Sequence, residues 1–354
     1  MAKKKLGVGV IGASNMAALH MQAAVSNPFT ELVAICDIHP ERITPRAEEF
    51  GVEKTYTDYN EMYKDPDVDI VVVCTPDFVH EDMAIKALEA GKHVLCEKPM
   101  APTNEECARM VEASKKYSAK MMVGQICRYT PSFVLAKKLI EQGEIGELYA
   151  VESEYAHDYK YANPGADNWR RDPKHPREGY VGGGCHVVDL LRWIAGDPTE
   201  VFAYANRKCL PDWPVDDSTF SLLKFPNDVV GKIYVSIGCK REYTLRSVFA
   251  GTKGTIICNN MDPTITLYKE DVSELNSLFP NKPEDRPNLV AVELPVSINH
   301  HNTAAELNEL VDCIVNDKPV KTTAYEGAAT VAVCLAAVES TKTGKVVQIK
   351  YPEK

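Results

Sequence analysis

The sequence predicts an α/β protein of two domains: a doubly wound parallel sheet of the Rossmann type, then an α+β domain with a large, mostly antiparallel open sheet. The chain has 354 residues, too many for one ordinary hydrophobic core. Up to about residue 123, Val-rich runs alternate with amphipathic stretches, which is typical of βαβ units. Beyond it, β-branched runs follow one another with few helices between them. We expect domains over residues 1–123 and 124–354, with the last helix packing back on the first domain.

The expected elements of the first domain follow from buried runs, helical spacing and stop signals. Gly91 is placed to end a helix at its C′ position. Thr103 and Glu106 have the spacing of a capping box and open the next helix. The expected strands cover residues 6–11, 32–36, 68–74 and 93–96, and the expected helices cover residues 16–26, a stretch ending at 50, and 79–90.

The expected second domain consists mainly of strands separated by turn signals such as Pro226-Asn227. Residues 156–183 fit no element, and a stretch of that length is usually functional or disordered. The expected strands cover residues 148–155, 219–223, 229–236 and 246–250, and the expected late helices cover residues 303–316 and 325–341.

Composition excludes several classes of protein. The formal net charge of −10 disfavours nucleic acid and anionic membrane surfaces as partners. No stretch is long and apolar enough to span a bilayer, and the apolar run ending at Gly12 lacks a cleavage-site pattern, so we interpret it as a strand. The 11 cysteines form no Cys-x-x-Cys pair. We therefore expect reduced buried thiols, no disulfide scaffold and no metal site, in a cytosolic protein.

The turn after the first strand has the composition of a dinucleotide-binding loop. Such a loop needs a glycine for the tight turn and small residues where backbone meets pyrophosphate and where helix meets strand. Gly12, Ser14 and Ala17 fill these places, and Asn15 and Met16 begin the helix whose N-terminus would hold the pyrophosphate. An ordinary strand–turn–helix is the alternative.

Asp37 strengthens the interpretation of a dinucleotide site. It ends the second strand, 25 residues after Gly12 (37 − 12), close to the usual spacing of roughly 20. A carboxylate there accepts hydrogen bonds from the ribose hydroxyls and repels a 2′-phosphate, which favours NAD. Asp37 as a helix cap is the alternative, and the nearby Arg42 keeps NADP open.

A lysine in Cys96-Glu97-Lys98-Pro99 lies at the carboxyl end of an expected parallel strand, where such sheets bind ligands. Together with Thr75-Pro76 and His80, this motif resembles the glucose–fructose oxidoreductase / inositol dehydrogenase / MocA family. The resemblance covers nearly the whole chain. It implies an NAD-dependent oxidoreductase in which Lys98 lies near both nicotinamide and substrate. The cofactor contacts it implies are Thr75, Pro76, His80, Glu97, Lys98, Gln125 and Arg128.

The string Gly182-Gly183-Gly184-Cys185-His186 precedes an expected helix over residues 187–195. A helix N-terminus disfavours imidazolium and so keeps a histidine neutral, as a general base must be; a plain helix cap is the alternative. By resemblance, Lys98 and His186 handle the substrate's proton, with either one as the base. Many relatives carry an aspartate four residues before the histidine, where this chain has Gly182. Asp172 or Asp189 could substitute, or Asp189 is a buried structural partner.

The segment 156–183 mixes aromatic and hydrogen-bonding side chains, which suits the apolar faces and hydroxyl rims of sugars. A polar surface loop or a subunit contact is the alternative. Tyr159, Trp169, Arg170 and Asp172 are the substrate residues we expect there, beside Lys98 and His186.

Taken together, the motifs predict hydride transfer between NAD and a secondary hydroxyl of a sugar, a glycoside or inositol. By resemblance, ring carbon 3 of a glycoside, including a C-glycoside, is one candidate position. A glycosidase that uses tightly bound NAD as a transient oxidant and a non-catalytic NAD-binding regulator are the alternatives. We expect a homo-oligomer, because a large open sheet needs a cover.

Overall fold

The computed structural model describes residues 5–162, 168–271 and 288–353. The chain forms two compact units. The first comprises Met1–Ile126, Asn302–Leu335 and Lys350–Lys354, and the second comprises Cys127–His301 and Ala336–Ile349.

The first unit contains a sheet of six strands, all parallel, in the order β3-β2-β1-β4-β5-β6. Every residue of Ile70–Val73 is buried, because helices cover both faces of such a sheet. The sheet therefore presents its ligand-binding edge at the carboxyl ends of the strands. Its strands are β1 (Leu6–Ile11), β2 (Thr30–Cys36), β3 (Lys54–Tyr56), β4 (Ile70–Val73), β5 (His93–Cys96) and β6 (Met121–Val123).

The helices of the first unit begin and end where local signals place them. Thr103 and Glu106 form the expected capping box of α5, with both reciprocal hydrogen bonds present. Gly51 ends α2 in the left-handed conformation. The helices are α1 (Asn15–Ser26), α2 (Pro40–Phe50), α3 (Tyr59–Tyr63), η1 (Asp77–Val79), α4 (His80–Glu89), α5 (Asn104–Lys116) and α10 (Thr303–Val315); η2 (Ile126–Tyr129) and α11 (Ala324–Thr343) contribute to both units.

The second unit contains a sheet of nine strands in the order β14-β13-β12-β11-β7-β10-β9-β8-β15. All neighbouring pairs are antiparallel except β7 and β10. The strands are β7 (Leu148–Ala156), β8 (Glu200–Asn206), β9 (Ser218–Lys224), β10 (Val230–Ser236), β11 (Thr244–Gly251), β12 (Gly254–Asn259), β13 (Thr264–Asp271), β14 (Asn288–Pro295) and β15 (Val347–Gln348).

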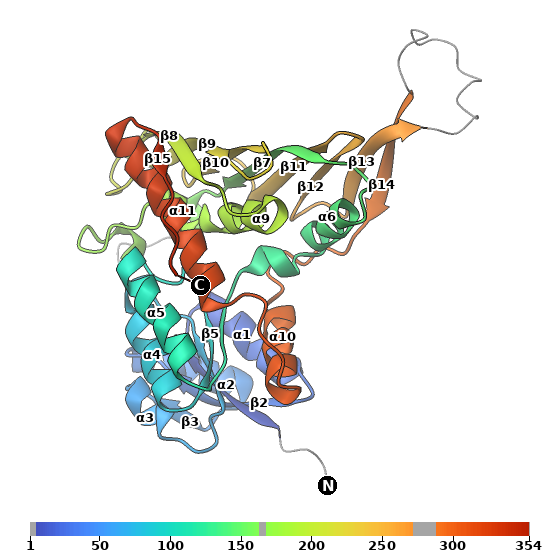
Figure 1. Ribbon diagram of the computed structural model, residues 1–354. Helices are drawn as coiled ribbons and strands as arrows, with labels where there is room; N and C mark the ends of the chain where they lie inside the picture. Colours follow the sequence, from blue (N-terminus) through green and yellow to red (C-terminus); the bar gives the residue numbers. More distant parts are fainter. Residues whose placement is uncertain (1–4, 163–167, 272–287, 354) are drawn as a thin grey trace. The chain divides into compact units, whose positions relative to one another are not determined.

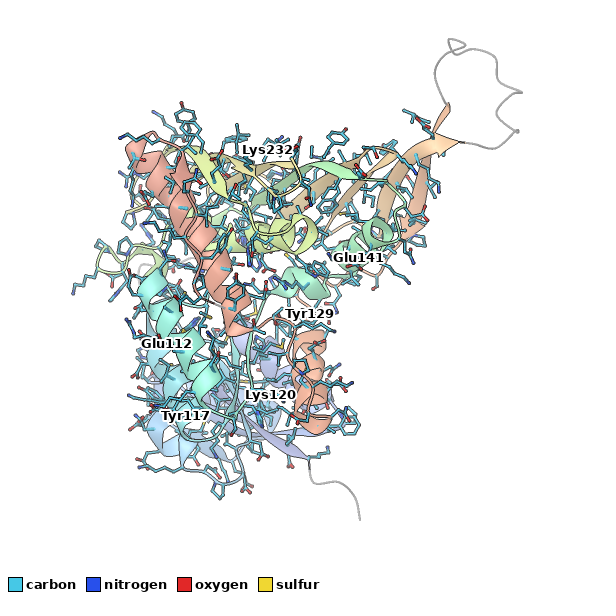
Figure 2. The ribbon with its side chains drawn as sticks, viewed as in Figure 1. Glu112, Tyr117, Lys120, Tyr129, Glu141 and Lys232 are labelled. Atoms are coloured by element: carbon cyan, nitrogen blue, oxygen red, sulfur yellow. The ribbon has the colours of Figure 1, made fainter. Side chains whose placement is uncertain are left out.

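Among the described residues, helices cover one face of this sheet and leave the other open. In Figure 1, α6 (Pro131–Glu141) and α9 (Cys185–Ala195) lie on the same face, α6 against β12 and β13 and α9 against β7 and β10. Figure 2 shows Lys232 of β10 on the opposite face from Glu141 of α6. Phe220 and Leu222 are also exposed there, because alternate residues of β9 point away from the helices. The remaining short helices are α7 (Tyr159–Ala162), η3 (Trp169–Arg171) and α8 (Gly179–Gly182).

The predicted fold class is confirmed, and several details are corrected. The expected helix over residues 187–195 begins two residues earlier, at Cys185, so His186 lies inside its first turn. The segment 156–183 contains the short helices α7, η3 and α8, while residues 163–167 lie outside the described part of the chain. Short or edge strands such as β3, β6 and β15 were not predicted, because two or three residues carry no periodicity. Among the described helices, none is long and apolar enough to cross a membrane.

Candidate active site

The glycine-containing turn of the first unit has the geometry that a bound pyrophosphate needs. Gly12 has a φ of 100°, and a Cβ at this position would lie 2.3 Å from the carbonyl oxygen of Cys74. Only glycine fits this conformation and this close approach. Ser14 caps α1 by accepting the Ala17 N–H at 3.3 Å, and Ala17 is fully buried at the base of the helix. Ser14 and Asn15 are exposed and Met16 is half-buried, so the positive end of α1 is open to an anion.

Asp37 is tied to this turn. Its Oδ2 accepts the Ala13 N–H at 2.9 Å and its Oδ1 accepts the His39 N–H at 3.0 Å. Each carboxylate oxygen has two acceptor positions, so both retain capacity for a ribose hydroxyl. The sequence left open that Asp37 is only a helix cap. In the structure its side chain also joins the end of β2 to the loop before α1.

His80 holds two predicted motifs together. It is 1% exposed, and its ring nitrogens lie 3.0 Å from the carbonyl oxygen of Thr75 and 3.1 Å from that of Pro99. Burial lowers the pKa of His80, and a neutral ring has one N–H, so it donates to one of these carbonyls at a time. His80 thus fixes the Thr75-Pro76 turn against the loop that carries Lys98. A direct contact between His80 and the cofactor stays a prediction.

Lys98 is the second residue after β5 and is held through its neighbours. Glu97 donates its backbone N–H to the carbonyl of Val73 at 2.9 Å, and its Oε2 accepts the Lys98 N–H at 3.1 Å. The peptide bond between Lys98 and Pro99 is cis. Lys98 is half-buried at the carboxyl edge of the parallel sheet, the edge where such sheets bind ligands.

Gln125 lies close to this edge, just after β6. It is 2% exposed, its backbone N–H donates to the carbonyl of Val123, and its Oε1 has no hydrogen-bond partner among the described residues. A buried amide oxygen of this kind suits a polar ligand.

His186 lies in the second unit, in the first turn of α9, and is 3% exposed. Its ring stacks on Tyr155 with centroids 5.9 Å apart and planes 14° apart. A Cβ at Gly183 would lie 2.3 Å from the Tyr155 ring, so the absence of a side chain there lets the tyrosine approach. The glycine string therefore sets the surroundings of His186.

An aromatic cluster surrounds His186 that sequence reasoning missed. Tyr155 Oη lies 3.0 Å from His157 Nδ1 and 3.2 Å from Tyr159 Oη, so the predicted Tyr159 belongs to this cluster. Burial raises the pKa of Tyr155, and the tyrosines beside it add to the effect, so its hydroxyl is neutral and can donate. The cluster draws on four separate segments, residues 155–159, 186, 243 and 300–301, and no motif in the sequence links these segments. The cluster comprises Tyr155, His157, Tyr159, His186, Tyr243, His300 and His301.

Arg128 has a structural partner. Its Nε and Nη2 donate to the two carboxylate oxygens of Asp189 at 2.8 and 2.7 Å, and both side chains are buried. This bidentate hydrogen bonding occupies the carboxylate of Asp189. The structure therefore favours the interpretation of Asp189 as a buried structural partner over that of a substitute for the missing catalytic aspartate. The predicted contact between Arg128 and the cofactor stays a prediction.

Trp169, Arg170 and Asp172 all lie around η3 and are half-buried. The guanidinium of Arg170 lies 4.6 Å from the Trp169 ring centre and that of Arg177 lies 5.0 Å from it. Arg177 also donates to the carbonyl of Gly182 at 2.8 Å, and a Cβ at Gly182 would lie 2.5 Å from its Nε. A guanidinium thus occupies the space beside the glycine that replaces the expected aspartate.

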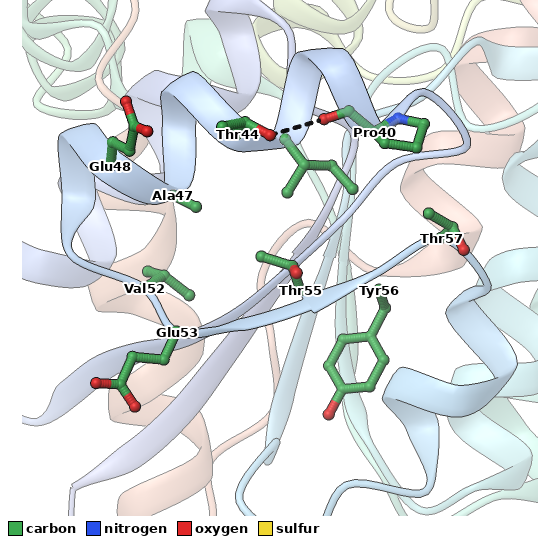
Figure 3. A pocket seen from close by; sticks show the side chains of 10 residues that line it. Pro40, Thr44, Ala47, Glu48, Val52, Glu53, Thr55, Tyr56 and Thr57 are labelled. Atoms are coloured by element: carbon green, nitrogen blue, oxygen red, sulfur yellow. Dashed lines mark hydrogen bonds between the residues drawn. The ribbon is translucent and has the colours of Figure 1, made fainter.

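A hollow of about 380 Å³ lies elsewhere in the first unit, between α2 and β3. Figure 3 shows Ala47 and Val52 lining it, with Thr44 hydrogen-bonded to the Pro40 carbonyl. None of the predicted site residues lines this hollow, so we assign it no part in the site.

Comparisons with known proteins agree with this picture. Residues 6–125 match the oxidoreductase family with an NAD-binding Rossmann fold, and residues 133–257 match the GFO/IDH/MocA C-terminal domain. A levoglucosan dehydrogenase of Pseudarthrobacter phenanthrenivorans is 30% identical over 72% of this chain and 74% of its own. A myo-inositol 2-dehydrogenase of Thermotoga maritima is 28% identical over 77% and 80%, respectively.

The same similarity holds in three dimensions. The solved structure of a levoglucosan dehydrogenase in complex with NADH and L-sorbose superposes with a TM-score of 0.86 at 26% identity, covering 99% of this chain and all of that one. The first unit, with its open helix N-terminus and the Asp37-braced turn, is accordingly an NAD-binding Rossmann domain. Because both halves of the chain match one family, the protein belongs to the GFO/IDH/MocA family of NAD-binding oxidoreductases.

Proposed function

We propose that this protein is an NAD-dependent dehydrogenase that oxidises a secondary hydroxyl of a sugar, a glycoside or an inositol. The observation that carries the proposal is Lys98, which His80 and Glu97 fix at the ligand-binding edge of an NAD-binding sheet. The relatives named for levoglucosan and myo-inositol act on cyclic compounds with several hydroxyl groups, which supports this substrate class.

The cofactor would be held by the first unit. The α1 N-terminus and the turn at Gly12 would take the pyrophosphate, and Asp37 would take a ribose. Thr75, Pro76 and Gln125 would line the rest of the site. Bound NAD supplies the hydride acceptor, and the chain supplies orientation and proton handling.

Lys98 and His186 would handle the substrate's hydroxyl proton. Such assistance typically contributes 10²–10⁴ in rate. We assign His186 as the base and Lys98 as the cation that stabilises the developing alkoxide, because the first turn of α9 disfavours an imidazolium. The stack of His186 on Tyr155 fixes the orientation of its ring.

The aromatic cluster of the second unit would bind the substrate. Tyrosine and histidine rings offer apolar faces together with hydrogen-bonding edges. These match the apolar faces and the rim of hydroxyl groups of a sugar ring. Tyr159, Trp169, Arg170 and Asp172 would contribute from α7 and η3. Ring carbon 3 of a glycoside remains the position that we propose for oxidation.

We also propose a homo-oligomer in the cytosol. Tyr204 and Leu222 are 70% and 61% exposed on the open face of the second sheet, and the Phe220 ring stacks on Tyr234 at 4.3 Å. A second copy of the chain is the natural cover for an apolar face of this kind. Nine of the 11 cysteines are buried, which suits thiols in a reducing compartment. Light scattering of the purified protein tests the oligomer.

The test of the activity incubates the protein with NAD and a panel of inositols, monosaccharides and glycosides, following NADH by absorbance and every substrate by chromatography. NADH formed together with a keto product is the expected result. Consumption of a glycoside without net NADH would point instead to a glycosidase that recycles its cofactor. NAD binding without turnover of any compound would support a regulator.

A further inference from the structure

Three titratable side chains of the first unit form a buried cluster to which the proposed mechanism assigns no proton transfer. They are His20 of α1, Glu97 at the end of β5 and Glu306 of α10. His20 Nε2 lies 2.9 Å from Glu97 Oε1, and since a carboxylate accepts, Nε2 carries the proton. The other oxygen of Glu97 accepts the backbone N–H of Lys98. The cluster therefore adjoins the backbone of Lys98, the residue that we place beside the substrate.

Glu306 is the anomalous member. It is fully buried, and neither carboxylate oxygen has a hydrogen-bond partner among the described residues; the Nδ1 atom of His20 also lacks one there. An ionised carboxylate in this position is costly, so the group takes up a proton instead. Burial raises the pKa of Glu306 well above its usual range, the charge of Glu97 adds to this, and the charge of Lys98 opposes it.

Glu97 behaves in the opposite way. Burial by itself would raise the pKa of Glu97, but the hydrogen bond from His20 and the charges of His20 and Lys98 outweigh burial and hold that pKa below its usual range. Two neighbouring carboxyl groups thus differ in protonation because their partners differ. Such a divergence is the pattern of groups that exchange protons.

The packing of α10 on α1 places Glu306 in this cluster. Helix α10 packs on α1, where the side chain of Asn27 donates to that of Asn308 at 2.6 Å and Thr303 donates to the Leu19 carbonyl at 3.2 Å. Gly124 lies beside Glu306, since a Cβ at this glycine would be 3.5 Å from the Glu306 carboxylate, an ordinary van der Waals contact. The groups that face Glu306 from the elements around it are His20, Glu97 and Lys98.

We propose that His20, Glu97 and Glu306 form a proton-holding site that exchanges a proton with Lys98 during turnover. This inference rests on the proposed dehydrogenase function. In the direction of carbonyl reduction, bound NADH would supply the hydride, and an N–H bond of the Lys98 ammonium breaks as its proton passes, directly or through His186, to the developing alkoxide. The O–H bond of the neutral Glu306 carboxyl then breaks, a new N–H bond forms on the Lys98 amine, and Glu306 is left as a carboxylate. Oxidation runs the same transfers in reverse, from ionised Glu306 to the neutral acid.

This exchange leaves the net charge of the two groups unchanged, because a neutral amine and a neutral acid become a cation and an anion. The same three side chains also suit a divalent metal ion, which takes histidine nitrogen and carboxylate oxygen. A proton fits the cluster better, because His20 and Glu97 already hydrogen-bond to each other and the positive Lys98 opposes a second cation.

The first test compares Glu306→Gln, which mimics the neutral acid in shape, with Glu309→Gln on the same helix, where Glu309 pairs with Lys321 instead. Single-turnover NADH formation is followed as a function of pH. Wild type and E309Q should share one ionisation in the profile, which E306Q loses along with at least about tenfold in rate. A profile for E306Q that superimposes on that of wild type overturns the proposal.

A second test needs no substrate and so stands even if the proposed activity fails. The infrared spectrum of the wild-type protein should contain the carbonyl band of a protonated carboxylic acid, shifted in heavy water and absent from E306Q. If E306Q does not fold, Glu306→Asp should retain the band at a changed position. Absence of the band from wild type, or its persistence in E306Q, overturns the proposal, as does a stoichiometric divalent metal in purified wild type that E306Q lacks.

Discussion

The two units carry their functional residues in different ways. In the first, Gly12, Asp37 and Lys98 lie one or two residues after the parallel strands β1, β2 and β5, so each is placed by a few residues of local backbone. In the second, the aromatic cluster draws on strand β7, helices α7 and α9 and three loop segments, from Tyr155 to His301. In the function that we propose, cofactor binding is therefore specified locally and substrate binding by tertiary packing.

The largest expected effect tests the first unit. Lys98→Ala should lower the rate of hydride transfer by about 10²–10⁴, because a cation beside the reacting hydroxyl is lost. NAD affinity should change little, since the turn at Gly12 and Asp37 is intact. Stopped-flow absorbance and calorimetric titration separate the two quantities. Lys64→Ala, on the exposed surface of α3, is the matched control. A near-normal rate in the Lys98 variant would remove that residue from the mechanism.

Sequence reasoning could single out candidate residues in the first unit because its motifs are short. Gly12, Asp37 and Lys98 each follow a hydrophobic strand, and the carboxyl ends of parallel strands meet at one edge. His80 was also singled out, and the structure places it between two carbonyl groups, while its contact with the cofactor stays a prediction.

The second unit resisted prediction for a physical reason. Alternation along a strand shows which face a residue occupies, but it does not show which distant residue lies opposite. Tyr243 and His301 stack at 5.8 Å although they are far apart in sequence, and Glu306 reaches Glu97 only because α10 packs on α1. The fold class could thus be predicted from one sequence, whereas these clusters could not.

Arg128 either stabilises the second unit through its ion pair with Asp189 or contacts the cofactor, and one substitution distinguishes these roles. Arg128→Met should lower the free energy of unfolding by about 3 kcal/mol, because Asp189 is left buried without its bidentate partner. Arg192, 3.8 Å from Asp189, limits the loss. Arg109→Met, which breaks the exposed pair with Glu81, should cost less than about 1 kcal/mol.

Urea unfolding measures both Arg variants, and calorimetry measures their NAD affinity. A small stability change with a large loss of affinity in the Arg128 variant would return this residue to the cofactor site.

A smaller effect is expected at Asp37. Removing the carboxylate in Asp37→Ala loses the brace on Ala13 and the proposed contact with ribose, so NAD should bind roughly 10–100-fold more weakly. Discrimination against NADP should also relax, because the negative charge is gone. Asp37→Asn keeps a hydrogen-bond acceptor without the charge, so its affinity for NAD should lie between those of wild type and Asp37→Ala. Equal affinities of all three proteins for both cofactors would exclude Asp37 from the site.

The last expected effect is on stability, and it separates the units again. The pKa of Glu306 is raised in the folded protein, whereas in the unfolded chain it is about 4.3. Below that value both states are protonated and the group favours neither. As pH rises, the unfolded chain ionises first, so wild type loses stability relative to Glu306→Gln, by at most about 1.4 kcal/mol per pH unit.

This difference should grow until the pH reaches the folded-state pKa of Glu306 and then level off. Urea unfolding at a series of pH values measures it, with Glu309→Gln as the control that stays parallel to wild type. The gap should also appear in the transition of the first unit, because the whole cluster lies there. A gap that is independent of pH would mean that Glu306 has an ordinary pKa, and the proton-holding site would lose its physical basis.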